Sequence, residues 1–115
     1  MCAVFGLTIK APEGLYQFYI ADILYIECRG RKKELTTLDN TIYKFFGRIE
    51  DIENDLKKHG FIRPHNSYLV NGIHVRKVMK NNLLLTEKYI AIPVSRKKYK
   101  QAYDDITVYA KGARL

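Results

Sequence analysis

The chain of 115 residues is long enough for one domain with a modest hydrophobic core. Twenty lysines and arginines against twelve acidic residues give a net charge of +8, which favours an anionic partner such as nucleic acid over a merely basic soluble surface. No apolar run approaches the roughly 20 residues of a membrane helix, and the first residues lack the pattern of a secretory signal. The two cysteines form neither a metal motif nor a disulfide framework, so a cytoplasmic protein with reduced thiols is expected.

The first part of the chain predicts short strands separated by turns. Residues 1–14 are weakly patterned and are expected to form a tail or a linker remnant. Asp39-Asn40 tolerates positive φ and therefore predicts a hairpin between two of the strands that follow. Four segments rich in apolar and β-prone residues are typical of β-strands: 15–20, 23–28, 34–38 and 41–46.

A dense basic run at residues 29–33 separates the second of these strands from the hairpin. A run of charges is usually a solvated face of a protein. This run is short and falls in a predicted loop, where its self-repulsion stabilises no element. We therefore expect it to contact an anion, and Arg29 and Arg31 are candidates for binding phosphate oxygens.

Residues 48–59 show the clearest helical pattern. Ile49, Ile52 and Leu56 share one face, and Gly60 follows as a C-cap. Acidic residues fill the first turns and basic residues the last turn, which is the arrangement that the helix dipole favours. Stability alone explains these charges, so no functional role is predicted for this helix.

A polar segment at residues 63–67 lies between two apolar segments. Its proline removes one backbone donor and biases the preceding residue away from helix, so the segment is predicted to be a fixed loop. A short buried strand at residues 68–70 follows and ends at an Asn-Gly turn signal. Such a loop presents His65 and Asn66 in a defined direction, unless these side chains merely bond to the loop backbone.

The last part of the chain predicts three more short strands and a second helix. The strands are expected at residues 73–79, 83–86 and 89–92. Ser95 is a suitable N-cap for a helix whose first turn then holds the cations Arg96, Lys97 and Lys98. Three cations at the positive end of a helix dipole are unfavourable for stability, so this turn is a candidate phosphate site rather than a screened basic turn. Residues 108–115 are expected to be a frayed tail.

Short strands at close spacing predict a mostly β domain of antiparallel sheets with one or two short helices. The three histidines lack the spacing of zinc ligands, and no phosphate-cradling glycine motif is present. The sequence therefore predicts a binding domain without a metal or cofactor rather than an enzyme.

Three motifs together resemble LytTR-type DNA-binding domains over residues 15–107. The main motif is FIRPHNSYLVN at residues 61–71, which is similar to the signature F-x-R-x-H-x-S-x-x-V-N. The other two are ILYIE at residues 23–27 and IPVSR at residues 92–96, in the same order as in the family. The resemblance implies an elongated stack of small antiparallel sheets, and a bacterial transcription regulator whose loops enter successive major grooves of bent DNA.

The resemblance also implies which residues meet double-stranded DNA. Residues expected to read base edges are Asn66, Arg96 and either Lys32 or Lys33, because loop lengths vary before the hairpin. Residues expected to hold phosphates are Arg29, Arg31, His65, Lys97 and Lys98. Asparagine suits adenine, and arginine suits guanine.

Members of the family are often two-component response regulators with an N-terminal receiver domain. This chain shows no receiver domain, so it is expected to be either a fragment of such a regulator or a stand-alone one. It lacks a heptad repeat, and we expect a monomer in dilute solution that places two copies on promoter repeats. The alternatives are a basic protein-interaction module and an RNA-binding β domain.

Overall fold

A computed structural model describes residues 6–86 and 90–113, with side chains up to residue 108. Ten strands lie within these residues: β1 (Leu7–Ala11), β2 (Gly14–Phe18), β3 (Ile23–Arg29), β4 (Lys32–Thr37), β5 (Ile42–Phe46), β6 (Phe61–His65), β7 (Tyr68–Asn71), β8 (Val75–Val78), β9 (Asn82–Leu85) and β10 (Ile90–Pro93). The two α-helices are α1 (Ile49–Lys57) and α2 (Tyr99–Ala113), and two 3-10 turns are η1 (Ile20–Asp22) and η2 (Gly72–His74).

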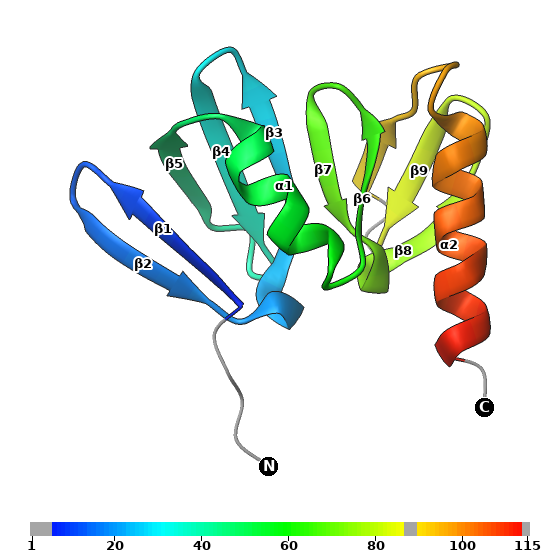
Figure 1. Cartoon of the computed structure of the whole chain (residues 1–115), viewed down its shortest axis with the longest axis horizontal. Coiled ribbons are helices and arrows are strands. Elements are labelled where there is room, and N and C mark those ends of the chain that lie inside the picture. The colour runs from blue at the N-terminus through cyan, green and yellow to red at the C-terminus, as the bar shows by residue number, and fades with distance from the viewer. Residues whose placement is uncertain (1–5, 87–89, 114–115) are drawn as a thin grey trace.

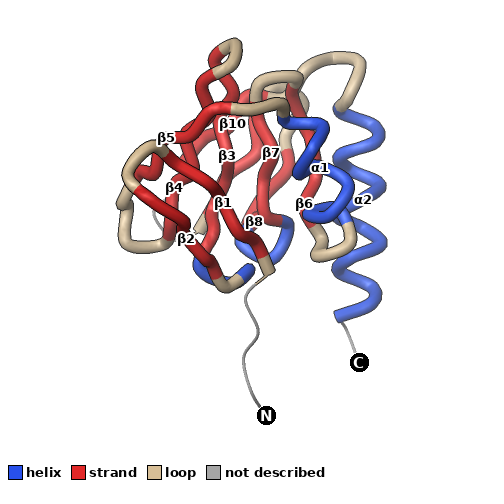
Figure 2. The backbone as a smooth tube through the Cα atoms, turned by 60° about the vertical axis from the view of Figure 1, so that its left-hand side comes forward, coloured by secondary structure: helices blue, strands red, loops and turns tan. Residues whose placement is uncertain are grey.

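The strands form three antiparallel sheets, which lie side by side across Figure 1. β1 and β2 make a hairpin, five strands follow in the order β5-β4-β3-β7-β6, and three strands follow in the order β10-β9-β8. Both helices contact β6, and Figure 2 shows them on the same side of the molecule. The predicted mostly β stack of small antiparallel sheets with helices is confirmed.

The five-stranded sheet is covered on both faces and divides the hydrophobic core into two clusters. The β1–β2 hairpin and α1 cover one face, and the three-stranded sheet and α2 cover the other. β7 shows the division, since its neighbouring residues Leu69 and Val70 are both fully buried but belong to different clusters. Successive side chains of a strand point to opposite faces, so a strand between two cores must be apolar on both.

Asn71 fixes the end of β7 inside the protein. Its side chain is fully buried, and Nδ2 donates hydrogen bonds of 2.9 Å to the carbonyls of Ile20 and Ile23. Its Oδ1 accepts a hydrogen bond of 3.4 Å from the Ile73 amide and so caps η2. The Asn-Gly pair therefore ends the strand as predicted, and the turn that it starts is the 3-10 turn η2. Gly72 is required here because a Cβ would collide with the carbonyl of Gly60.

The N-terminal region differs from the expected tail. Residues 7–11 form β1 and pair in register with β2, and both Leu7 and Ile9 are buried. Two alternating apolar residues are too few to identify a strand from sequence, and it is their contact with the first core cluster that orders them. Residues 1–5 of the expected tail lie outside the described residues.

The polar segment at residues 63–67 is not the fixed loop that the sequence predicted, because its first three residues belong to β6. Pro64 is tolerated in this strand for two reasons: β6 is the edge strand of its sheet, and the pairing register shifts between Ile62 and His65. The turn itself consists of Asn66 and Ser67. The sequence prediction missed the strand because proline argues against one wherever its place in the sheet is unknown.

The second helix begins later than predicted and runs further. α2 starts at Tyr99, and Ser95 precedes a turn in which the Lys98 amide donates to the Ser95 carbonyl at 3.1 Å. Arg96, Lys97 and Lys98 therefore occupy a turn before the helix and not its first three positions. The helix continues to Ala113, through most of the expected C-terminal tail. Residue 89 of the predicted strand 89–92 lies outside the described residues.

Candidate nucleic-acid interface

Four connections between elements lie along one edge of the molecule, at the top of Figure 1. They are the turns β3–β4, β6–β7 and β8–β9 and the segment that joins β10 to α2. β1 begins and α2 ends at the opposite edge. We call the edge with the four connections the turn edge.

Backbone hydrogen bonds join each connection of the turn edge to a neighbouring strand or loop. The donor and acceptor pairs are Gly47 N to Arg31 O at 3.2 Å, Cys28 N to Ser67 O at 2.7 Å, Ser95 N to Pro64 O at 2.9 Å, and Val94 N to Asn81 O at 2.9 Å. Because these bonds belong to the main chain, the spacing of the turns does not depend on the side chains that project from them. The turn edge is thus a fixed scaffold for the residues at its tips.

The β3–β4 turn carries the basic run, and its two lysines differ in how far they are exposed. Lys32 pairs with Arg29 across the strands, and its side chain is 42% exposed. Lys33 points to the opposite face, is 3% exposed, and donates from Nζ to the Gly30 carbonyl at 2.6 Å. Lys32 can therefore reach a ligand outside the protein, whereas Lys33 is part of the fold. Arg31 is exposed at the tip.

The β6–β7 turn presents Asn66 at its tip. The Asn66 side chain is exposed and makes no hydrogen bond to the described residues. The backbone carbonyl of Asn66 accepts a hydrogen bond of 2.9 Å from Arg63 Nη2. Within the turn, the Ser67 amide donates to Nδ1 of His65 at 3.1 Å. A neutral imidazole that accepts at Nδ1 carries its proton on Nε2, so His65 keeps a donor for a phosphate oxygen. The alternative that both side chains merely bond to the loop backbone therefore holds for His65 but not for Asn66, whose side-chain amide has no partner among the described residues.

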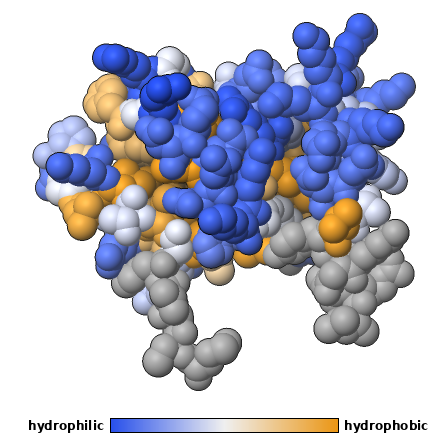
Figure 3. Space-filling model, viewed as in Figure 1, coloured by the Kyte–Doolittle hydropathy of each residue, from blue (hydrophilic) through white to orange (hydrophobic). Residues whose placement is uncertain are grey.

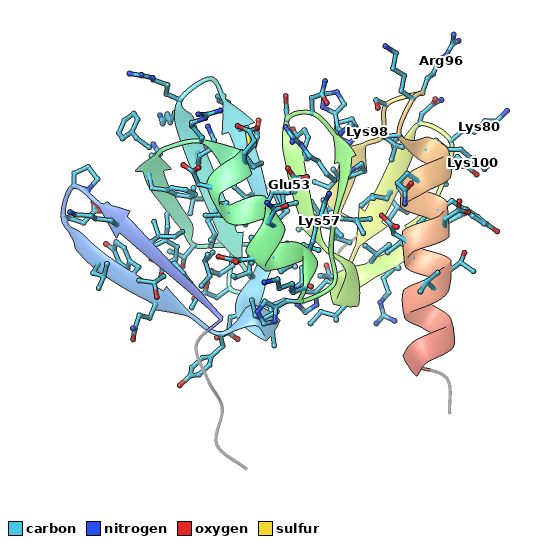
Figure 4. The ribbon with its side chains drawn as sticks, viewed as in Figure 1. Glu53, Lys57, Lys80, Arg96, Lys98 and Lys100 are labelled. Atoms are coloured by element: carbon cyan, nitrogen blue, oxygen red, sulfur yellow. The ribbon has the colours of Figure 1, made fainter. Side chains whose placement is uncertain are left out.

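The segment between β10 and α2 holds three cations in two settings. Arg96 and Lys97 are exposed, and Figure 4 shows Arg96 projecting away from the protein at the turn edge. Lys98 is partly buried and lies toward α1 (Figure 4). Burial lowers the pKa of Lys98, and the nearby Arg63 lowers it further, while the carboxylate of Glu53 opposes this.

A hollow of about 310 Å³ lies between the β3–β4 and β6–β7 turns. It is lined by four basic side chains and one acidic one, Arg31, Lys33, Arg48, Arg63 and Glu50, together with small and apolar residues. Cys28 also lines it, and burial raises the pKa of its thiol. The described residues contain no cluster of histidine, cysteine and acidic residues that could hold a metal ion. Across the same part of the chain, no helix is both long and apolar enough to cross a membrane.

Comparison with known proteins decides the family. The sequence model of the LytTr DNA-binding domain matches residues 13–106. The chain belongs to the LytTR family of DNA-binding domains. The fold of this LytTR domain is similar to a LytTr DNA-binding domain from a protein described as a methyl-accepting/DNA response regulator of Bacillus cereus, with a TM-score of 0.69 and 21% identity over 90% of this chain and 97% of that one. No curated protein sequence matches the chain.

The family assignment makes DNA the partner of this LytTR domain. The structure brings Asn66, Arg96 and Lys32 to the turn edge, although they come from three separate connections. It also brings the basic residues Arg29, Arg31, His65, Lys97 and Lys98 to that edge or next to it. Of the residues implied by the resemblance, Lys33 is the one that the fold turns inward.

The LytTR domain carries further cations on the turn edge that the sequence prediction missed. Lys80 lies in the β8–β9 turn, and Figure 4 shows Lys80 and Lys100 on the same side as Arg96. Arg48 is 78% exposed in the loop before α1. Hydrophilic side chains cover much of this edge in Figure 3. The sequence signal for Lys80 was a turn pattern alone, and its place beside Arg96 follows from pairing of Asn81 with Val94, which sequence does not reveal.

Proposed function

We propose that this LytTR domain binds specific sequences of double-stranded DNA as the effector domain of a cytoplasmic bacterial response regulator. The observation that carries the proposal is the turn edge: the β3–β4, β6–β7 and β10–α2 connections, distant in sequence, lie in one row, backbone hydrogen bonds fix each of them to a neighbouring strand or loop, and basic side chains lie in or beside each. A row of fixed, cationic turns matches a partner with regularly spaced grooves and phosphates. A merely basic soluble surface would not need its charges on one scaffolded edge.

Three side chains are suited to reading bases. Asn66 is short and stands on a braced turn, so its amide can form two hydrogen bonds with adenine in the major groove. Arg96 is exposed and projects outward, and a guanidinium pairs with the O6 and N7 atoms of guanine. Lys32 takes the third position in preference to Lys33 because its ammonium is accessible.

Other basic side chains on or beside the turn edge would hold the phosphates on either side of these contacts. This set comprises Arg29, Arg31, His65, Lys97 and Lys98, with Lys80 and Arg48 added by the structure. A contact to phosphate through charge carries no sequence information, so these residues add affinity beside the residues that read bases.

The size of the domain fits a short half-site. Its principal extents are 38 × 38 × 26 Å, and one turn of B-form DNA is about 34–36 Å long. One domain can therefore span about one helical turn, and two copies would occupy adjacent repeats. We expect sedimentation to find a monomer without DNA and two domains on a duplex with two repeats, whereas a stable dimer without DNA would contradict this.

Selection of binding sites from random duplex DNA tests the proposal. We expect a recovered consensus, and we expect affinity for it to fall with salt by about 0.9 in log–log slope per phosphate contact. A flat salt response or the absence of any consensus would refute sequence-specific DNA binding. Preference for single-stranded RNA in the same titration would support the RNA-binding alternative.

A further inference from the structure

Arg63 bridges α1 and the β6–β7 turn through the two ends of its guanidinium. Nη1 donates to Glu53 Oε1 on α1 at 3.0 Å, and Nη2 donates to the carbonyl of Asn66 at 2.9 Å. The side chain is 20% exposed, and its Nε is buried without a hydrogen-bond partner among the described residues. A guanidinium is a rigid fork, so fixing one nitrogen on Glu53 also fixes the direction of the other.

Glu53 is built to hold that fork in place. Its side chain is 13% exposed, and Lys57 Nζ approaches its other oxygen at 3.5 Å from one helical turn away. Figure 4 shows Glu53 and Lys57 on the face of α1 that looks toward Lys98 in the turn before α2. Glu53 is therefore the acidic member of a cluster with three cations, Lys57, Arg63 and Lys98.

Glu50 provides a natural comparison on the same helix. Its Oε2 lies 3.9 Å from Arg63 Nη1, and its side chain is 56% exposed. An exposed ion pair at that distance contributes little, whereas the short and largely buried bond to Glu53 is geometrically specific. Arg63 is thus oriented by Glu53 and not by acidic residues of α1 in general.

We propose that Glu53 is a positioning residue for DNA reading: it holds Arg63, and Arg63 in turn fixes the Asn66 carbonyl and so aims the Asn66 side chain. Glu53 itself does not touch DNA. The inference rests on the proposed function, because it assumes that Asn66 reads a base. It gives α1 a role in sequence discrimination that the dipole-matched charges of this helix do not indicate.

The test compares Glu53→Ala with the matched control Glu50→Ala, which removes the same charge from the same helix. Each folded variant is titrated with the selected cognate duplex and with a scrambled duplex at one salt concentration. Loss of a carboxylate near DNA should tighten binding to the scrambled duplex equally in both variants. We expect the ratio of cognate to scrambled affinity to fall about tenfold in Glu53→Ala, within the range for one base contact, and to stay unchanged in Glu50→Ala.

A charge-conserving variant covers the case in which Glu53→Ala does not fold. In Arg63→Lys a single ammonium replaces the fork and cannot hold both Glu53 and Asn66. We expect the same fall in the affinity ratio, with the salt slope unchanged because the net charge is unchanged. In an amide spectrum without DNA, the signals of Asn66 and Ser67 should move in Glu53→Ala but not in Glu50→Ala.

The outcomes separate this inference from the function on which it rests. A wild-type domain that binds both duplexes equally refutes sequence-specific binding, and the positioning role with it. A wild-type domain that discriminates, together with a folded Glu53→Ala or Arg63→Lys variant that discriminates equally well, overturns the positioning role alone. Signals of Asn66 and Ser67 that do not move in folded Glu53→Ala overturn it as well.

Discussion

The β3–β4 and β6–β7 turns lie on the same edge, and the bond between Cys28 of β3 and Ser67 links the strand to the second turn, yet the two turns present different side chains. The β6–β7 turn is braced by Arg63 and His65, and it presents the short amide of Asn66. The β3–β4 turn has Gly30 at a φ of 63° and presents long cations on its outer side.

The difference separates two tasks in recognising DNA. A base contact must be aimed accurately, and a rigid backbone with a short side chain such as that of Asn66 favours such aiming. A phosphate contact needs positive charge within reach, and a flexible side chain supplies it from a simple turn. The β6–β7 turn is suited to reading, and the β3–β4 turn mainly to holding.

Removing Arg63, which braces the β6–β7 turn, should have the largest effect on stability. Arg63→Ala deletes both hydrogen bonds and leaves Glu53 largely buried without its main partner. Breaking such a pair is costly, and we expect the free energy of unfolding to fall by about 3 kcal/mol. Urea denaturation measures this value. A loss below about 0.5 kcal/mol would place the pair among ordinary surface ion pairs and would remove the contrast between the two turns.

Removing the Asn66 side chain while keeping Arg63 should affect only the affinity for the cognate DNA sequence. Asn66→Ala should weaken binding to the cognate duplex by about 1–3 kcal/mol, because one amide–base pair is lost. Binding to a scrambled duplex and the salt slope should stay unchanged, since no charge is removed. Titrations of both duplexes at several salt concentrations check this. An equal loss on both duplexes would make Asn66 a structural residue of the turn.

The two lysines of β4 should respond in opposite ways. Lys33→Ala removes a buried stem and the bond to Gly30, so we expect the free energy of unfolding to fall by roughly 1–2 kcal/mol with little change in DNA affinity. Lys32→Ala should weaken DNA binding and leave stability nearly unchanged. Thermal unfolding and DNA titration of both variants measure the contrast. Weaker DNA binding by folded Lys33→Ala would show that Lys33 leaves its buried position.

A residue that contacts phosphate should contribute equally to the affinity for cognate and for scrambled DNA. Lys98→Ala should weaken cognate and scrambled binding by the same factor and reduce the salt slope by about 0.9, as expected for one phosphate contact. Lys58→Ala is the control, because it removes the same charge from an exposed position at the C-terminal end of α1. If Lys58→Ala changes the slope as much as Lys98→Ala does, the effect is one of net charge and not of position.

The smallest effect distinguishes two arginines of the β3–β4 turn. Arg29 Nε donates to Glu27 Oε2 at 2.9 Å, so part of its charge is already neutralised, whereas Arg31 has no ion pair among the described residues. Arg29→Ala should therefore lower the salt slope by less than Arg31→Ala, whose effect should approach about 0.9. Salt titrations of the two variants on one duplex compare them directly. A larger change for Arg29 would mean that it exchanges Glu27 for a phosphate.

The sequence by itself determined the features that depend on neighbouring residues. The apolar face of α1, the buried strand at residues 68–70 and the positive φ of Asn40 all follow from local pattern and side-chain chemistry, and all are present. The motif at residues 61–71 identified the family for the same reason, since it is contiguous.

Only the tertiary structure decided which residues share the turn edge and which are withdrawn from it. Lys33 lies inside because of the face on which β4 places it, and Pro64 is accepted because β6 is an edge strand. The bridge from Glu53 through Arg63 to Asn66 requires α1 to pack beside β6. Sheet order, register and helix docking arise from contacts between distant parts of the chain, and these contacts leave no periodic pattern in the local sequence.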